Sequence, residues 1–448
     1  MQIVAGSVRY DSQQPRRLMW PHFLMALYGI GWAVALDYGV RIYASEVFSL
    51  VGLGFVGWRR PLDQYPMVKK ILAAYGLWII AIILADLINE TAFFDSARAI
   101  ATPVLGGISL VFVLAVVSRN KRSFLTFLAA TALAKGVLGE PIYGDKYADI
   151  GLDINTAIQT TDYFKIRFEP FITPAIVLIS CLLVRMRMHG LSYLILIMTS
   201  IMYLSMDTRS VGGILLFSSM VLIAKSYDIR LNSVTILTAI TIAIAVSYGI
   251  YVAYTYNTLS SGIGHNATQL MRMKNPYNPF ELMLQGRSEW SIASDVVRER
   301  PLFGYGSWAR DLGNHYTDLM YDRSGVYQQR VKYENDWNYI PVHSLILSSW
   351  VWAGGLGLIS SLYVVKHVLK LFQLTLSVRS PLIPAAIFFM LGTLWHCFFS
   401  PPQAVRFFFP HALAITIVLT APVFAALPTR HRTRRMGSRV RGVSRARL

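Results

Sequence analysis

Apolar runs long enough to cross a bilayer recur along nearly the whole chain of 448 residues. A helix needs about 20 predominantly apolar residues to span the hydrocarbon layer of a membrane. The runs therefore predict an all-α polytopic membrane protein with about twelve transmembrane helices. The predicted spans cover residues 18–38, 41–58, 67–88, 97–117, 122–139, 168–185, 190–206, 209–225, 233–255, 341–366, 380–400 and 405–427.

One segment interrupts this series of apolar runs. Residues 256–340 separate the ninth and tenth predicted spans and are rich in Tyr, Asn, Arg and Asp. A loop of this length is usually functional or disordered, and its aromatic residues and helical pattern favour order. The predicted organisation is nine helices within residues 1–255, a loop domain with short helices at 256–340, three helices within 341–427 and a basic tail at 428–448.

The placement of charge predicts the orientation of the helices. Lys and Arg gather in every second connection between the predicted spans, and eight arginines follow Pro428. Positively charged connections remain in the cytoplasm, so we predict an inner-membrane protein with both termini cytoplasmic. Residues 256–340 then form a loop on the outer side, and a second, acidic loop at roughly 140–166 lies on the same side.

Composition narrows the class of partner. Hydrophobic residues make up 54% of the chain and charged residues only 15%, whereas soluble domains are roughly a quarter charged. We interpret the net charge of +18 as topology and attraction to anionic lipids, and we expect no nucleic-acid partner. Cys181 and Cys397 both fall inside apolar spans, where we interpret them as small core residues.

Residues 288–300 of the large loop predict a short amphipathic helix. Ser288 is a candidate N-cap, and Pro301 ends the helix. Its apolar face is expected to hold Trp290, Ile292, Ala293, Val296 and Val297. Arg287 precedes the N-terminal end of this helix, where the backbone favours an anion. It is therefore either part of an anion site or an ordinary solvated arginine.

Two further arginines stand at the predicted outer surface. Arg209 lies in SMDTRSVGG, in the tight turn between two apolar spans. An ionisable residue at the membrane edge usually faces a partner or an aqueous cavity, so Arg209 either pairs with Asp207 or binds a phosphate. Arg167 opens the sixth span, where it either reaches lipid headgroups or adds to the same anion site.

His343 opens the tenth predicted span, in IPVHSLILSSWVWAGGLGLI. On a regular helix, one face carries His343, Leu347, Trp350, Gly354 and Gly357. Glycines at this spacing allow another helix to approach closely. A histidine at a helix start is either structural or, because imidazole titrates near neutral pH, a candidate general base.

Three sequence elements follow one another along the chain. They are TRS at 208–210, the pair GRSEW and PLFGYG within 286–306, and His343-Ser344 followed by nine residues, Gly354, two residues and Gly357. Together they resemble the O-antigen ligase and O-antigen polymerase superfamily of bacterial envelope glycosyltransferases. Residues 167–174 match more loosely, because the family's usual asparagines are missing. The resemblance covers roughly residues 160–400.

The resemblance implies a metal-independent, inverting glycosyltransferase of the GT-C type. Such enzymes take a glycan from undecaprenyl diphosphate on the periplasmic side. A ligase transfers it to lipid A–core, and a polymerase transfers it to another carrier-linked repeat unit. The complete spacing of the His-Ser-Gly-Gly signature favours the ligase.

The resemblance also implies roles for individual residues. His343 would take the proton from the acceptor hydroxyl as a general base. Fixed arginines would stabilise the charge that develops on the lipid diphosphate. The expected diphosphate-binding residues are Arg209, Arg287 and Arg167. The expected substrate-lining residues are Trp290, Tyr305 and Ser344, with packing as the alternative role of the two aromatic side chains.

No cofactor is expected from the sequence. It contains no Cys/His cluster with metal-ligand spacing. Asp145, Asp149 and Asp153 recur at intervals of four in the acidic outer loop and would align on a helix, but Gly151 interrupts that stretch. A cation site there is a weaker interpretation than solvated acidic residues.

Other functions stay open on the sequence alone. A polymerase of O-antigen or exopolysaccharide repeat units shares the motifs, and protein O-glycosylation is a more distant variant. A twelve-helix secondary transporter would be expected to show two related halves and ionisable groups near the bilayer midplane. Here the charged candidates gather at one surface, which favours an enzyme over a transporter or a structural scaffold.

Overall fold

The computed structural model describes residues 19–37, 41–139, 164–206, 208–227, 245, 248–249, 251–260, 270–271, 273, 275–278, 288–324 and 339–426. These residues are mostly helical. Four of the described helices are long and apolar enough to cross a membrane: α4 (Pro66–Ile88), α5 (Phe93–Arg119), α12 (Arg209–Ser226) and α18 (Leu345–Leu376). The prediction of an all-α membrane protein is confirmed at this level. The count of twelve spans stays a prediction.

Shorter helices complete the apolar part of the molecule. They are α1 (Trp20–Gly31), α2 (Ala44–Val56), α6 (Ser123–Leu138), α10 (Glu169–Arg185), α11 (His189–Ser205), α19 (Ile383–Phe399) and α21 (Phe409–Ala426). The connections hold α3 (Arg59–Gln64), the π-helix η1 (Phe164–Phe168), α16 (Ser288–Glu299), the 3-10 helix η2 (Leu312–Asn314), α17 (His315–Ser324) and α20 (Ala404–Phe407). Residues 251–260 are also helical and extend past the predicted end of the ninth span at 255.

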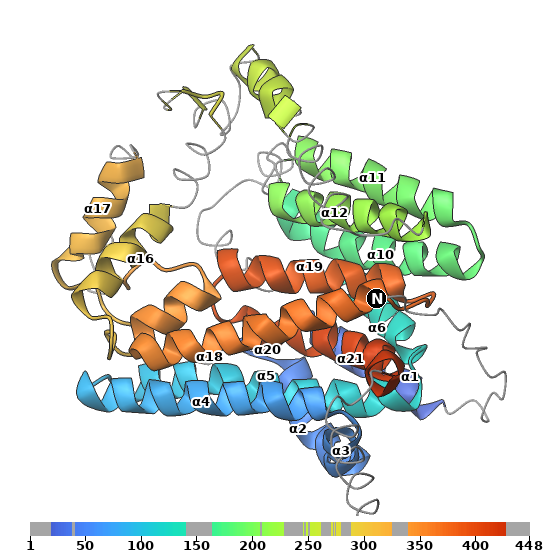
Figure 1. Ribbon diagram of the computed structural model, residues 1–448, viewed down its shortest axis with the longest axis horizontal. Helices are drawn as coiled ribbons and strands as arrows, with labels where there is room; N and C mark the ends of the chain where they lie inside the picture. Colours follow the sequence, from blue (N-terminus) through green and yellow to red (C-terminus); the bar gives the residue numbers. More distant parts are fainter. Residues whose placement is uncertain are drawn as a thin grey trace, which may run out of the picture.

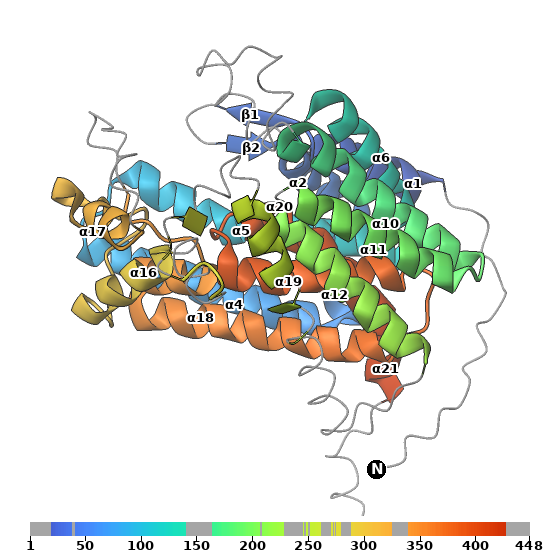
Figure 2. The same ribbon diagram turned by 90° about the horizontal axis from the view of Figure 1, so that it is seen from above.

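The long helices lie side by side along the longest axis of the molecule (Figure 1). α18 packs against α4 and α19, and α5 packs between α4, α2 and α21. A group formed by α10, α11 and α12 covers the other side of α19. In both views, α16 and α17 lie beside one end of the α4–α18 pair (Figures 1 and 2). The described helices of the large loop therefore sit at one end of the helical frame.

The middle of α5 lies in the buried core of the molecule. The seven residues from Val111 to Val117 are all buried, so this helix is enclosed by other helices on every side in that stretch. A helix that is apolar all round needs such an environment or a membrane. α4 differs, because Ile80, Leu84 and Leu87 on one of its faces are exposed. That exposed apolar face is suited to lipid.

The first predicted span is shorter than expected. α1 ends at Gly31, and a two-stranded antiparallel sheet follows, formed by β1 (Ala35–Asp37) and β2 (Arg41–Tyr43). A helix continuing to residue 38 would carry Asp37 into the apolar layer. In the hairpin, Asp37 instead stands opposite Arg41 in the strand register. The prediction of a single helix over 18–38 was therefore wrong in its last third.

The last spans also differ in detail from the prediction. α18 continues to Leu376, ten residues beyond the predicted end at 366. Lys370 in this extension remains compatible with a helix, because a long side chain carries its charge away from the apolar surface. The span predicted at 405–427 is divided into α20 and α21. Phe408 separates the two helices, and Pro410 near the start of α21 has no backbone N–H to donate.

Candidate functional site at the junction of α16, α18 and α19

His343 lies at the junction of three helices. It stands two residues before α18, and Ser344 is the N-cap of that helix. The Ser344 hydroxyl accepts a hydrogen bond from the backbone N–H of Leu347 (3.3 Å) and donates one to the Cys397 carbonyl of α19 (3.2 Å). A serine N-cap satisfies one of the free N–H groups at a helix start. Ser344 thus holds the backbone beside His343 in place, and its predicted contact with substrate stays a prediction.

Glu289 in the first turn of α16 approaches the imidazole of His343. The distance from His343 Nδ1 to Glu289 Oε1 is 3.6 Å, and the side chains are 50% and 20% exposed, respectively. The other carboxylate oxygen, Oε2, is buried and has no hydrogen-bond partner within the described part of the chain. The pair therefore combines an accessible imidazole with a carboxylate whose hydrogen-bonding capacity is not filled. Such a carboxylate can orient an imidazole that transfers protons.

Trp290 anchors the start of α16. Its ring stacks on Phe399 at the end of α19, with ring centroids 5.4 Å apart and an interplanar angle of 17°. The predicted apolar face of α16 is confirmed, because Ile292, Ala293, Val296 and Val297 are buried. The helix ends at Glu299, just before Pro301. Packing accounts for the Trp290 ring here, and its predicted role in lining the substrate site stays a prediction.

The loop that follows α16 enters a break in α18. Ala353 and Gly354 have non-helical backbone angles, so the carbonyls of the preceding turn lose their partners within the helix. The loop replaces these partners: Tyr305 N–H donates to the Val351 carbonyl (2.8 Å) and Gly306 N–H to the Trp352 carbonyl (3.1 Å). The PLFGYG loop and the His-Ser-Gly-Gly signature are thus joined by backbone hydrogen bonds.

The break changes the expected role of the glycines in α18. Gly354 has φ +61°, and a Cβ at this position would overlap the Leu302 carbonyl. The Gly355 N–H also donates to that carbonyl (3.0 Å). The close neighbour of Gly354 is therefore the backbone of a loop and not a second helix. The prediction of one continuous glycine face failed because a regular helix was assumed through residue 354.

Tyr305 forms a hydrogen-bonded group within the loop domain. Its hydroxyl donates to Glu299 (2.6 Å) and lies 3.0 Å from the Tyr316 hydroxyl, which also donates to Glu299 (2.7 Å). The two tyrosine hydrogen bonds hold the pKa of the Glu299 carboxyl below its usual range. Burial and the bond to Glu299 raise the pKa of Tyr305. The group ties α16, the loop and α17 together.

Of the three predicted diphosphate-binding arginines, two are described. Arg209 is the first residue of α12, and its Nη2 donates to the Tyr254 hydroxyl at 3.1 Å. Arg167 lies in η1, directly before α10. Arg287 lies outside the described residues, as does Asp207, the proposed local partner of Arg209. The expected meeting of these arginines with His343 stays a prediction.

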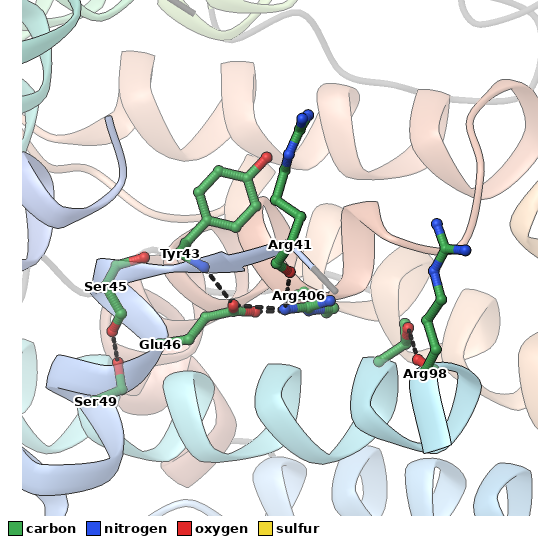
Figure 3. Close-up of polar contacts among 8 residues, drawn as sticks. Arg41, Tyr43, Ser45, Glu46, Ser49, Arg98 and Arg406 are labelled. Carbon is green, nitrogen blue, oxygen red and sulfur yellow. Dashed lines mark hydrogen bonds and ion pairs between the residues drawn. The ribbon is translucent and has the colours of Figure 1, made fainter. Parts of the chain in front are cut away.

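A second charged cluster, which the sequence analysis missed, lies where β2, α2 and α20 meet (Figure 3). Arg406 is buried and donates to both oxygens of Glu46, from Nε to Oε1 (2.7 Å) and from Nη2 to Oε2 (2.6 Å). Arg406 also donates to the Arg41 carbonyl (3.0 Å), and the Tyr43 N–H donates to Glu46 (2.9 Å). The cluster pins the hairpin to the helical frame. Glu46 and Arg406 are 360 positions apart in the sequence. The signal for the cluster in the sequence was that each is a charged residue within a predicted apolar span.

Neither the described side chains nor the comparisons with known proteins assign a metal site or a family. Among the residues with described positions, no group of three or more His, Cys, Asp or Glu side chains is placed to hold a metal ion. Asp145, Asp149 and Asp153 lie outside those residues. No protein-family model matches the chain, and no curated protein matches it.

Proposed function

We propose that this chain is an inner-membrane glycosyltransferase that transfers a glycan from undecaprenyl diphosphate to an acceptor hydroxyl on the periplasmic side. The favoured reaction is that of an O-antigen ligase, with lipid A–core as acceptor. The main support is that two motifs far apart in the sequence contact each other in the structure. Glu289 of GRSEW approaches His343 at 3.6 Å, and the PLFGYG loop is hydrogen-bonded into the break at Gly354.

The chemistry of the proposed reaction requires one proton transfer and one bond exchange. His343 accepts the proton of the acceptor hydroxyl while that oxygen attacks the anomeric carbon of the glycan. The bond between this carbon and the diphosphate oxygen breaks with inversion, and the lipid diphosphate leaves with an additional negative charge. Guanidinium groups can stabilise this charge by bidentate hydrogen bonds, without a metal ion. Arg209, Arg287 and Arg167 are proposed for this role.

A half-exposed histidine suits this reaction better than a buried one. His343 is 50% exposed, so an acceptor can reach its ring. His411, by comparison, is completely buried in α21, and its ring packs against Trp32, Phe127 and Phe389. Among these two histidines, only His343 offers an imidazole nitrogen to a substrate.

A deletion strain of the host bacterium tests the proposal and separates the two acceptors. Loss of the ligase should leave long chains on the lipid carrier, with none attached to lipid A–core, in gels of lipopolysaccharide and of carrier-linked glycan. Accumulation of single repeat units would assign the protein as a polymerase. Unchanged attachment and unchanged chain length in the deletion strain would refute both forms of the proposal.

A further inference from the structure

The tip of the PLFGYG loop presents two large apolar side chains to the outside of the protein. Leu302 is 69% exposed and Phe303 is 57% exposed. The backbone around them is nevertheless held firmly. Trp350 Nε1 donates to the Pro301 carbonyl (3.0 Å), and the Gly355 N–H donates to the Leu302 carbonyl (3.0 Å). The exposure of these side chains is therefore a fixed feature of the fold and not the result of a loose segment.

Contacts with α4 place this tip at the end of a candidate membrane-spanning helix. Asn89, the C-cap of α4, accepts a hydrogen bond from Arg300 (2.9 Å) and donates one to the Gly304 carbonyl (3.4 Å). Asp86 in the last turn of α4 accepts from the Ser307 N–H (2.6 Å) and hydroxyl (2.9 Å). The loop on both sides of the tip is thus bonded to the last turn of α4 or its cap.

The length of α4 indicates where the apolar layer ends. Its 23 residues correspond to about 34 Å at 1.5 Å per residue. This length is close to the roughly 30 Å of hydrocarbon in a typical bilayer. The last turn of α4 therefore marks one boundary of the layer, and the loop tip lies at that boundary.

Further apolar side chains are exposed at the same level. Leu87 and Ile88 at the end of α4 are 73% and 55% exposed, and Phe93 and Phe94 at the start of α5 are 81% and 76% exposed. Polar residues occupy the short turn between these two pairs, in the sequence Asn89-Glu90-Thr91. Alternation of large apolar and polar side chains at one level is typical of the boundary between headgroups and acyl chains. In water, exposed apolar groups of this number would be unfavourable.

We propose that Leu302, Phe303, Phe93 and Phe94 form an outer apolar edge that inserts into the headgroup–acyl boundary of the bilayer. The partner is the phospholipid surface itself. The edge directly adjoins the exposed apolar face of α4, so one continuous lipid surface would cover both. The inference extends beyond the proposed reaction and does not depend on it.

Fluorescence quenching in vesicles tests the outer apolar edge. Phe303→Cys and, separately, Leu302→Cys are labelled with bimane in the full chain, reconstituted into vesicles of phosphatidylethanolamine and phosphatidylglycerol. Leu312→Cys is the matched control, because Leu312 is 84% exposed but lies in η2 outside the edge. The unsubstituted chain gives the labelling background, since Cys181 and Cys397 are buried.

The proposal predicts that lipid-borne quenchers reach the labels at 302 and 303, whereas aqueous quenchers reach the control label at 312. Labels at 303 and 302 should be quenched by lipids with a nitroxide near the top of the acyl chain and at least about threefold less by aqueous iodide than the label at 312. Iodide quenching at 303 and 302 equal to that at 312 would overturn the proposal, and it would indicate that this surface faces water or an absent protein partner. The two edge variants are read independently, so failure of one to fold leaves the other as the test.

Discussion

The pair formed by Glu46 and Arg406 and the pair formed by Glu289 and His343 each join helices that are far apart in the sequence, but they are built differently. The first is closed: its side chains are 1% and 7% exposed, and Glu46 accepts three hydrogen bonds. The second is open: its side chains are 20% and 50% exposed, and one carboxylate oxygen has no described partner.

This difference separates a structural role from a chemical one. A buried carboxylate and guanidinium that satisfy each other have little capacity left for a substrate, and removing one of them leaves a charge without compensation. An accessible imidazole beside an incompletely bonded carboxylate can still gain a hydrogen bond when a substrate arrives. The comparison therefore predicts that the first pair controls stability and the second controls activity.

The largest expected effect is on folding, from Glu46→Ala. Loss of this carboxylate leaves Arg406 buried and unpaired, which typically costs about 3–5 kcal/mol. The free energy of unfolding, measured in detergent with a chemical denaturant, should fall by that amount. Asp63→Ala is the control, because Asp63 and Lys69 form an exposed pair at 3.1 Å that should contribute no more than about 1 kcal/mol. Equal losses for the two variants would remove the distinction between closed and open pairs.

Glu289→Gln should affect activity and leave stability almost unchanged. The amide keeps the size of the side chain but cannot stabilise a positively charged imidazole, so we expect kcat to fall by about 10²-fold, with little change in KM. Glu289→Asp should recover part of the rate. If Glu289→Gln lowered the free energy of unfolding as much as Glu46→Ala does, the assignment of different roles to the two pairs would be contradicted.

Gly354→Ala should reduce both stability and activity, because it strains the contact between the PLFGYG loop and the break in α18. The position of the pair formed by Glu289 and His343 depends on this contact. The added Cβ overlaps the Leu302 carbonyl in a backbone conformation with φ +61°, and such strain typically costs about 1–3 kcal/mol. The temperature of thermal unfolding and the rate of glycan transfer should both decrease. Gly190→Ala is a matched control, since a Cβ there has no atoms within 4 Å. Wild-type behaviour of Gly354→Ala would show that the loop does not need the break.

The smallest expected effect is a pH dependence of stability in the loop domain. The hydrogen bonds from Tyr305 and Tyr316 lower the pKa of Glu299 from its ordinary value of 4.5. A carboxyl with a lowered folded-state pKa stabilises the fold above its unfolded value and loses this contribution as pH falls through the folded value. The difference in melting temperature between wild type and Glu299→Gln should therefore be present at pH 7 and shrink below about pH 4.5. A difference that stays constant over this range would contradict the assignment.

The helices were predictable because each is a local pattern. Long apolar runs, such as those of α4 and α5, need no tertiary information to be recognised. The amphipathic pattern and Pro301 likewise predicted α16 to within one residue of its end. These features depend only on residues that are close together in the sequence.

The contacts that build the site were only partly predictable. The motifs identified His343 as a candidate, but nothing in the local sequence indicated that Glu289 would face it. The break at Gly354 was missed because the carbonyls that it frees are bonded by a loop about 50 residues earlier in the sequence. The contact of Arg406 with Glu46 depends on packing between the second and last predicted spans. Such pairings follow from tertiary structure and not from local spacing.

The role of His343 is tested most directly by transfer in a purified system. Full-length wild type, His343→Ala and His189→Ala, an exposed histidine at the start of α11, would be incubated with undecaprenyl diphosphate-linked glycan and lipid A–core in buffer containing excess EDTA. We predict transfer by wild type and by His189→Ala, and a rate about 10²–10⁴-fold lower for folded His343→Ala. Transfer by His343→Ala at the wild-type rate, or loss of all transfer in EDTA, would contradict the proposed metal-independent general-base mechanism.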